Sequence, residues 1–180
     1  MRKLILILVL SASAFAQSAG DVQKMLVAEA EKLRAVGKDA TVVAAVKAQN
    51  AKKITLTKIK VADNRWGVNK EGALVKKTIT GPCADRLRAI VVVNPAYSET
   101  FAMDDQGAIV CATAKTTDYW QGDEAKWERA YNGGKGDVFI DRPKLDESAG
   151  ARIAQISVPV MDGDVAIGVI TVGVVVEKLR

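Results

Sequence analysis

The strongest constraint on the fold is an apolar segment near the C-terminus, ARIAQISVPVMDGDVAIGVITVGVVV (residues 151–176). Its two Val- and Ile-rich runs flank Asp162-Gly163, a dipeptide that favours the tight turn of a β-hairpin. The second run is apolar at consecutive positions, as expected for a central strand that is covered on both faces. Pro159 lacks a backbone N–H and therefore predicts a sheet edge or a bulge in the first run. The segment thus predicts a long hairpin inside a larger sheet.

A second hairpin is expected upstream, in SETFAMDDQGAIVCATA (residues 98–114). Two short alternating runs, one with Phe101 and Met103 and one with Ile109 and Cys111, flank a Gly-containing turn. The run DVFID (137–141) predicts one further strand. Together with the helices described next, these runs predict one α+β domain with five mainly antiparallel strands.

The N-terminal half of the chain is expected to be helical. Apolar residues recur at helical spacing from Val22 to Val36, and Gly37 then interrupts the pattern. Asp39 or Thr41 can cap a second segment that ends near residue 50. One long kinked helix and two successive helices both fit this pattern.

The next elements are less regular. Residues 52–81 alternate only weakly, and we expect a connecting segment in which Trp66 anchors the chain against the core. Gly81-Pro82 opens another helix, because the missing N–H of proline is harmless in a first turn. Pro95 ends this helix. Its buried side is expected to comprise Leu87, Ile90, Val91 and Val93.

The first residues have the pattern of a secretory signal peptide. Arg2 and Lys3 precede a short apolar run, and small residues follow up to Ala16. We expect cleavage after Ala16, a periplasmic or secreted location and no membrane insertion of the mature chain, with residues 17–180 forming a single domain. An uncleaved anchor is the alternative.

Composition excludes several classes of function. The chain has no histidine, which removes Ser-His-Asp and Cys-His catalytic sites and the HExxH zinc helix. Basic residues are scattered rather than interleaved with aromatics, so no nucleic-acid partner is expected. We expect no enzymatic activity, no cofactor and no metal site. Cys83 and Cys111 can form one disulfide in an exported chain, or can be two separate buried thiols.

An aromatic stretch, TTDYWQGDEAKW (residues 116–127), is the candidate site. Aromatic side chains and neighbouring charges of both signs suit a small zwitterionic solute. Lys126 or Arg129 would meet its carboxylate, Asp118 or Asp123 its ammonium group, and Trp120 or Trp127 would supply an aromatic face for the cation. A stripe of rings at helical spacing can also be simple core packing. The candidate ligand-binding residues in and after this stretch are Tyr119, Trp120, Asp123, Lys126, Trp127 and Tyr131.

The element order, with FAMDDQGAIVCAT (101–113) and QISVPVMDGDVAIGVITVGV (155–174), resembles the extracellular PAS-like sensor domains called Cache or PDC domains. The resemblance implies a long N-terminal helix beside a five-stranded sheet, with short flanking helices. It also implies a ligand pocket on one sheet face, bounded by the helix after the second strand. By position, Asp146 would lie at the pocket mouth against a ligand amine.

The resemblance implies a periplasmic sensory domain that binds an amino acid, organic acid or amine. Most members of the family belong to membrane receptors or kinases, whereas only EKLR follows Val176 here. We therefore expect a stand-alone exported form, which binds its ligand in solution or reports it to a membrane receptor or another envelope protein. The alternative function is an envelope protein–protein interaction module with an aromatic surface. An exposed patch of Trp rings would favour that alternative, and an enclosed cavity would favour ligand binding.

Overall fold

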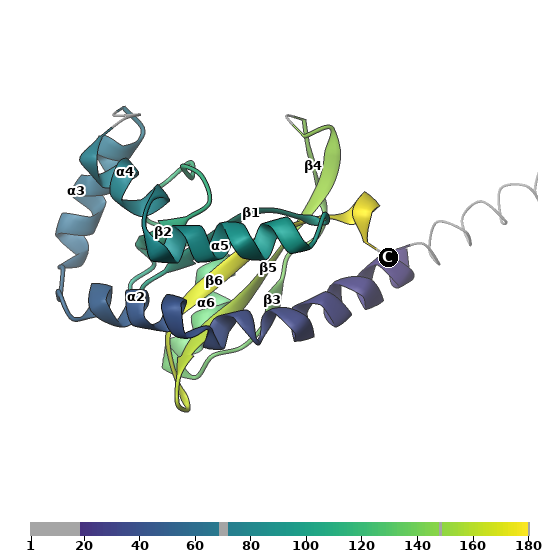
Figure 1. Cartoon of the computed structure of the whole chain (residues 1–180), viewed down its shortest axis with the longest axis horizontal. Coiled ribbons are helices and arrows are strands. Elements are labelled where there is room, and N and C mark those ends of the chain that lie inside the picture. The colour runs from purple at the N-terminus through teal and green to yellow at the C-terminus, as the bar shows by residue number, and fades with distance from the viewer. Residues whose placement is uncertain (1–18, 69–71, 148, 180) are drawn as a thin grey trace, which may run out of the picture.

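The computed structural model of the chain describes residues 19–68, 72–147 and 149–179, so the predicted signal peptide (1–16) lies outside the described residues. An antiparallel sheet forms the middle of the domain (Figure 1). The N-terminal helix (residues 19–33) and helices α2 (Ala40–Asn50) and α5 (Pro82–Val93) cover its first face. Helices α3 (Leu56–Trp66), α4 (Ala73–Ile79) and α6 (Ala125–Tyr131) pack at its second face. Among the described helices, none is long and apolar enough to cross a membrane.

The sheet has the strand order β2-β1-β6-β5-β3, and β4 also pairs with β5. The strands are β1 (Tyr97–Met103), β2 (Ile109–Ala112), β3 (Phe139–Ile140), β4 (Lys144–Asp146), β5 (Ala151–Asp162) and β6 (Val165–Val175). Every pairing is antiparallel. The α+β class is confirmed, but the expected five strands are six. Because β3 and β4 pair with successive parts of β5, the six strands fill five positions in the sheet.

Both predicted hairpins are confirmed. Strand β6 lies between β1 and β5, which explains why it is apolar on both faces. Pro159 of β5 lies beyond the end of β3, which pairs only with Ser157 and Ile156, so its missing N–H costs no ladder bond on that side. A register shift follows immediately between Val160 and Met161. Both local features that Pro159 predicted, an edge and a bulge, are therefore present.

The first helical region is two helices rather than one. A short 3-10 turn, η1 (Val36–Lys38), separates the N-terminal helix from α2 (Ala40–Asn50). Asp39 caps α2, since its Oδ1 accepts the backbone N–H groups of Thr41 at 3.0 Å and Val42 at 3.4 Å. The N-terminal helix and α2 cross the front of the sheet in Figure 1.

The prediction of a connecting segment at residues 52–81 is wrong, because most of this stretch forms α3 (Leu56–Trp66) and α4 (Ala73–Ile79). Its β-branched and Lys residues hide the helical spacing of Ile59 and Trp66, both of which are buried. The role expected for Trp66 is confirmed. Its side chain is 2% exposed, and its Nε1 donates to the carbonyl of Thr116 at 2.8 Å.

Helix α5 (Pro82–Val93) begins at the predicted proline. Leu87 and Ile90 are buried as expected, but Val93 is 80% exposed, because the helix ends there and the chain turns at Asn94 toward β1. Cys83 of α5 and Cys111 of β2 form a disulfide between the first helical layer and the sheet.

Two packed clusters make up the core, one on each face of the sheet. The first-face cluster is almost entirely aliphatic and joins the N-terminal helix, α2 and α5 to β1, β5 and β6. The second-face cluster contains most of the aromatic rings and joins α3, α4 and α6 (Ala125–Tyr131) to β1, β2 and β6. The two faces therefore differ in the side chains that pack on them as well as in the helices that cover them.

Candidate functional site

A row of four side chains crosses the second face of the sheet. Phe101 of β1 pairs with Thr171 of β6, Thr171 with Ser157 of β5, and Ser157 with Phe139 of β3. The hydroxyl groups of Ser157 and Thr171 are fully buried and hydrogen-bond to each other at 2.8 Å. Polar groups in the middle of an apolar sheet are stable only when paired in this way.

Helix α6 lies over this row and brings two cations to it. Lys126 Nζ lies 5.5 Å from the ring centroid of Phe101, and the guanidinium of Arg129 lies 5.2 Å from that of Phe139. The side chain of Lys126 is only 12% exposed, and its Nζ lies 3.0 Å from a carboxylate oxygen of Glu124. Lys126 is therefore a largely buried cation between α6 and the sheet.

The second face is polar beyond this row. Gln155 Nε2 donates to Glu99 Oε1 at 3.1 Å, and the backbone N–H of Asp141 donates to the carbonyl of Gln155 at 2.8 Å. A cavity of about 450 Å³ opens over these side chains, and we call it the sheet-face cavity. Its lining residues are Glu99, Asp141, Lys144, Leu145, Asp146, Glu147, Ile153 and Gln155.

Asp141 links the cavity to the cations. Its Oδ2 lies 2.8 Å from Lys144 Nζ, and its Oδ1 accepts the backbone N–H of Arg142 at 2.8 Å. Burial acts to raise the pKa of Asp141, but these hydrogen bonds and the charges of Lys144 and Lys126 outweigh burial and lower it. Asp141 is therefore held ionised, and the cavity presents charges of both signs.

The seven candidate residues lie in three places rather than in one pocket. Asp146 lines the sheet-face cavity, and Lys126 lies under α6 on the same face. Trp120 and Asp123 line a second cavity of about 540 Å³, which we call the loop cavity. The remaining three, Tyr119, Trp127 and Tyr131, pack in the second-face cluster.

The aromatic rings close the β2 end of the second face. Tyr119 is 4% exposed, and its ring centroid lies 5.4 Å from that of Trp66. Trp127 and Tyr131 stack with centroids 4.9 Å apart. Burial, followed by the charge of Asp104, raises the pKa of Tyr119 to about 12. This arrangement agrees with the packing interpretation of the ring stripe.

Two backbone contacts fix the loop that carries Tyr119 and Trp120. Asp63 Oδ1 on α3 accepts the N–H of Tyr119 at 2.8 Å and that of Trp120 at 3.0 Å. Gly107, with φ +85, has no room for a side chain because the backbone of Gly122 lies against it. The loop therefore packs directly on the turn of the first hairpin.

The loop cavity has a different character. Lys60 Nζ lies 4.4 Å from the ring centroid of Trp120, and the indole Nε1 donates to the carbonyl of Gln106 at 2.8 Å. The other lining residues are Asp63, Asn64, Asp118, Asp123 and Glu124. A cation of the protein itself therefore occupies the face of Trp120.

The rings do not form an exposed aromatic patch. The exposed large apolar side chains in the described part of the chain are all Val or Leu. Within residues 19–68, 72–147 and 149–179, no group of three or more Cys, Asp or Glu side chains is arranged to hold a metal ion.

Glu99, Asp141 and Gln155 are not among the residues predicted for the site. The sequence did contain an indication of two of them, because Glu99 lies two positions from Phe101 on its strand, and Gln155 two positions from Ser157, so each points to the same sheet face as that neighbour. Polar residues at alternate positions of otherwise apolar strands indicate a sheet face that is not covered by apolar packing. The contact of Gln155 with Asp141 depends on the pairing of β3 with β5, which local sequence patterns do not specify.

Neither a protein-family model nor a curated protein matches the chain. Among solved structures, the extracellular domain of the putative histidine kinase vpHK1S-Z8 is 10% identical with a TM-score of 0.52, over 96% of this chain and 61% of that domain. The Vibrio cholerae histidine kinase DctB sensor domain is 15% identical with a TM-score of 0.48, over 93% and 57%. The ligand-binding domain of the Pseudomonas aeruginosa PAO1 amino-acid chemoreceptor PctC, in complex with GABA, is 16% identical with a TM-score of 0.44, over 73% and 62%.

At these identities the similarity concerns the fold alone. The chain has the fold of an extracellular sensor domain, and the expected Cache or PDC architecture is confirmed at that level. It spans about three fifths of the length of the sensor domains that it matches.

Proposed function

We propose that this chain is an extracytoplasmic sensory domain without catalytic activity, which binds a small polar or zwitterionic solute in the sheet-face cavity. The solute class is an amino acid, an organic acid or an amine. The observation that supports this proposal is a cavity of about 450 Å³ that combines carboxylates with the Lys144 cation on a partly uncovered sheet face. Small-molecule sites commonly have this size and a few convergent polar groups.

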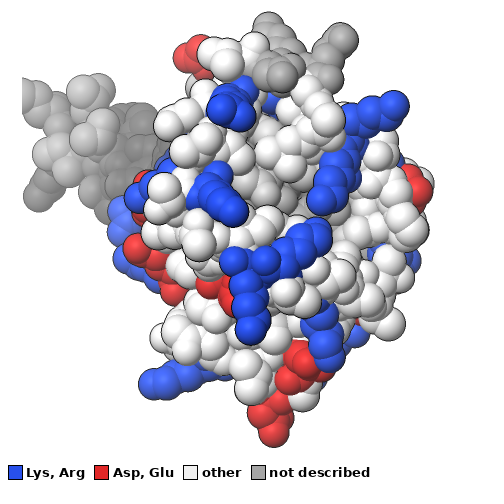
Figure 2. Space-filling model, turned by 90° about the vertical axis from the view of Figure 1, so that its left-hand side faces the viewer, with Lys and Arg blue, Asp and Glu red and all other residues white. Residues whose placement is uncertain are grey.

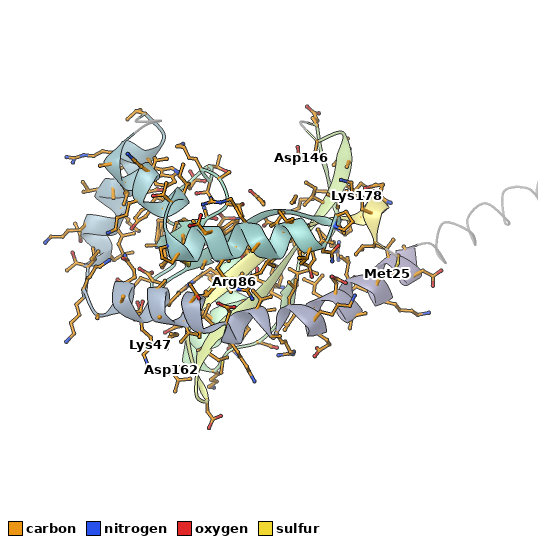
Figure 3. All side chains as sticks on the ribbon, viewed as in Figure 1. Met25, Lys47, Arg86, Asp146, Asp162 and Lys178 are labelled. Atoms are coloured by element: carbon orange, nitrogen blue, oxygen red, sulfur yellow. A yellow bond between two sulfur atoms is a disulfide. The ribbon has the colours of Figure 1, made fainter. Side chains whose placement is uncertain are left out.

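The charges can meet the two ends of a zwitterion. Lys144, which lines the cavity, would bind a solute carboxylate, and Lys126 under α6 adds positive charge on the same sheet face. Asp146 of β4 (Figure 3) and Glu99 of β1, which line the same cavity, would bind a solute ammonium group. Gln155 can then orient the solute through its amide, which the Glu99 carboxylate holds in place. Recognition by two separated charges would favour amino acids over ions with a single charge.

The aromatic residues would act indirectly in this proposal. Trp127 Nε1 donates to the carbonyl of Asp104 at 3.0 Å, which ties α6 to the turn of the first hairpin. Tyr131 stacks on Trp127 and holds the same helix. These two residues would therefore position Lys126, while Tyr119 would seal the core beside Trp66.

The proposed protein is exported and acts together with a partner. The predicted signal peptide supports a periplasmic or secreted location, and the sensor-domain fold supports a partner that reads the bound state. A membrane receptor or another envelope protein would be that partner. The interaction module with an aromatic surface has less support, because the described rings are buried or half-buried.

A thermal-shift screen of amino acids, organic acids and amines tests the proposal. A solute present at about a hundred times its Kd should stabilise the protein by about 2.7 kcal/mol. Calorimetry with the best solute should then show a loss of affinity of about tenfold or more for Asp146→Asn and for Lys144→Met, as for a charged contact. Asp164→Asn, an exposed carboxylate in the β5–β6 turn, is the matched control and should bind as the unmodified protein does.

The outcome also distinguishes the two cavities. If Asp123→Asn abolishes binding while Asp146→Asn leaves it unchanged, the solute occupies the loop cavity and the sheet-face proposal is wrong. If no compound in the three classes stabilises the protein, the proposed solute class is wrong.

A further inference from the structure

The net positive charge of this chain comes from one segment. Residues 52–80 contain eight basic and two acidic residues, whereas the other 151 residues contain 18 basic and 19 acidic ones. Two of these ten charged residues, Lys70 and Glu71, lie outside the described residues, and their opposite charges cancel in the count. The chain is therefore electrostatically asymmetric, and helices α3 and α4 form its basic end.

Figure 2 views this end of the molecule. Lys and Arg side chains surround an area of uncharged atoms, and acidic side chains lie mainly toward the edges of the view. The one acidic residue of α3, Asp63, is engaged with the backbone N–H groups of Tyr119 and Trp120. The described part of residues 52–80 has no other carboxylate, so this surface is not neutralised from within.

A groove lies between the two helices. It has a volume of about 280 Å³, and Lys58 and Arg65 stand among its lining residues. The apolar lining residues are Val61, Ala62, Trp66, Ala73, Leu74 and Val75. Val61, one of these apolar lining residues, is 46% exposed. A rim of cations around an apolar depression is the pattern of an interface core with a charged edge.

Two lysines at this end repel each other. Burial and, next, the neighbouring charge of Lys77 lower the pKa of Lys52. An anionic group brought to this place would relieve that repulsion, in the way that opposite charges across an interface favour association.

We propose that the α3–α4 surface, made of Lys58, Val61, Arg65, Lys76 and Lys77, docks an acidic protein partner that inserts an apolar side chain into the groove. The charge asymmetry supplies the argument for an acidic partner, and the groove supplies the place for an apolar anchor. This inference goes beyond ligand binding in the sheet-face cavity and does not depend on it.

A protein partner fits this surface better than an anionic membrane does. Interfacial helices insert Trp, Phe or Leu side chains into the lipid headgroup region. Here Trp66 is 2% exposed, and the exposed apolar side chains of α3 are Leu56 and Val61, which are less than half exposed. Figure 1 also places this surface at the end of the domain opposite to residues 19 and 179, where a second molecule has free access.

Asp63 gives the surface a physical connection to the rest of the domain. The same carboxylate belongs to α3 and holds the loop that leads into α6. Helix α6 carries Lys126 and Trp127. Asp63 thus joins α3, which carries part of the docking surface, to the loop that precedes α6.

A binding experiment with a synthetic peptide tests the proposal. The probe has Glu residues on both sides of a single Leu, and two control peptides carry Gln for Glu or Ser for Leu. We expect the protein to bind the Glu/Leu probe, and binding to weaken steeply as salt is raised from about 0.05 M to about 0.5 M. Both control peptides should bind about tenfold or more weakly.

Matched variants locate the binding. Lys58→Glu combined with Lys76→Glu and Lys77→Glu should abolish binding, whereas Lys38→Glu combined with Lys135→Glu and Lys178→Glu changes the net charge equally and should retain it. All six lysines are exposed, so circular dichroism should show both triple variants folded. Val61→Ser should weaken binding several-fold without any change of charge.

Three results would overturn the proposal. The first is equal binding by both triple variants, which would indicate attraction without a defined site. The second is tighter binding to vesicles of phosphatidylglycerol and phosphatidylcholine than to the peptide, which would indicate a membrane surface instead. The third is no measurable binding of the peptide even at low salt.

Discussion

The two faces of the sheet are built from the same strands but differ in what covers them. On the first face, the N-terminal helix, α2 and α5 bury an aliphatic cluster over β1, β5 and β6. On the second face, aromatic packing covers only the end near β2, and Glu99, Asp141 and Gln155 follow on the other end. The first face therefore supplies stability, and the uncovered part of the second face is available for binding.

The difference between the two faces follows from the alternation of side chains along each strand. Neighbouring residues of β5 point to opposite faces, so Ile156 is buried under the helices while Gln155 lines the sheet-face cavity. One strand can thus contribute to the stability of the domain and also present polar groups to a solute. Variants on the two faces should separate these two contributions.

Substitution of Ile156 and of Gln155 gives the sharpest contrast. Ile156→Ala leaves a cavity in the first-face cluster and should lower the free energy of unfolding by about 4 kcal/mol. Gln155→Ala removes a half-buried side chain and its hydrogen bond to Glu99, so it should lower the free energy of unfolding by only about 1 kcal/mol, yet weaken solute binding. Urea unfolding of both variants measures the two changes in the free energy of unfolding. Similar losses of stability would contradict the separation of the two faces.

Removal of the disulfide should have the next largest effect. Cys83 and Cys111 are 28 residues apart and tie α5 to β2. Because the link restricts the unfolded chain, Cys83→Ala with Cys111→Ala should lower the free energy of unfolding by about 3 kcal/mol. Thermal unfolding with and without reductant measures it. The reductant should not affect the double variant, and an effect there would point to another cause.

Asp63→Ala probes the closed end of the second face. It removes the acceptor of two backbone N–H groups and should cost about 2 kcal/mol. Since Asp63 does not line the sheet-face cavity, solute affinity should change little compared with Asp146→Asn. Calorimetry and thermal unfolding of the same samples provide the comparison. A complete loss of solute binding would show that the two ends of this face are not separate.

Asp39→Ala probes the helix layer and its pH dependence. Asp39 caps α2 and lies 2.6 Å from Arg86 of α5, so the change should cost about 1 kcal/mol at neutral pH. Burial acts to raise the pKa of Asp39, but the hydrogen bond and charge of Arg86 and the N–H groups of Thr41 and Val42 lower it overall.

A carboxylate with a lowered folded-state pKa stabilises the protein at pH values above its unfolded-state pKa. This contribution disappears as the pH falls through the folded-state pKa. The difference in stability between Asp39→Ala and the unmodified protein should therefore shrink in acid. A difference that grows below the usual pKa of aspartate would contradict the assignment.

The sequence predicted the parts of the fold that depend on local patterns. The two hairpins turn at Asp162-Gly163 and at the Gly107 turn, and Pro82 opens α5, because turn and cap preferences act over a few residues. Helix α3 was missed because Thr and Lys residues mask its short buried stripe, and only packing on the second-face cluster makes that stripe visible.

The candidate site was less predictable for a related reason. Lys126 and Asp146 lie on the sheet face that the resemblance implied, but Trp120 and Asp123 line a separate cavity. Rings and charges lie close together in the sequence, but Trp120 and Asp123 precede α6 whereas Lys126 lies on it, so they occupy different places. The approach of Asp141 to Gln155 arises from pairing along β5, so it depends on residues far apart in the chain.

Nuclear magnetic resonance with the solute found by the thermal-shift screen locates the binding site residue by residue. Amide shifts should be recorded for the assigned protein as the solute is added. We expect perturbations at Glu99, Asp141, Asp146 and Gln155, with the amides of α2 and α5 unchanged. Perturbations confined to Lys60, Trp120 and Asp123, or to the first-face helices, would contradict binding in the sheet-face cavity.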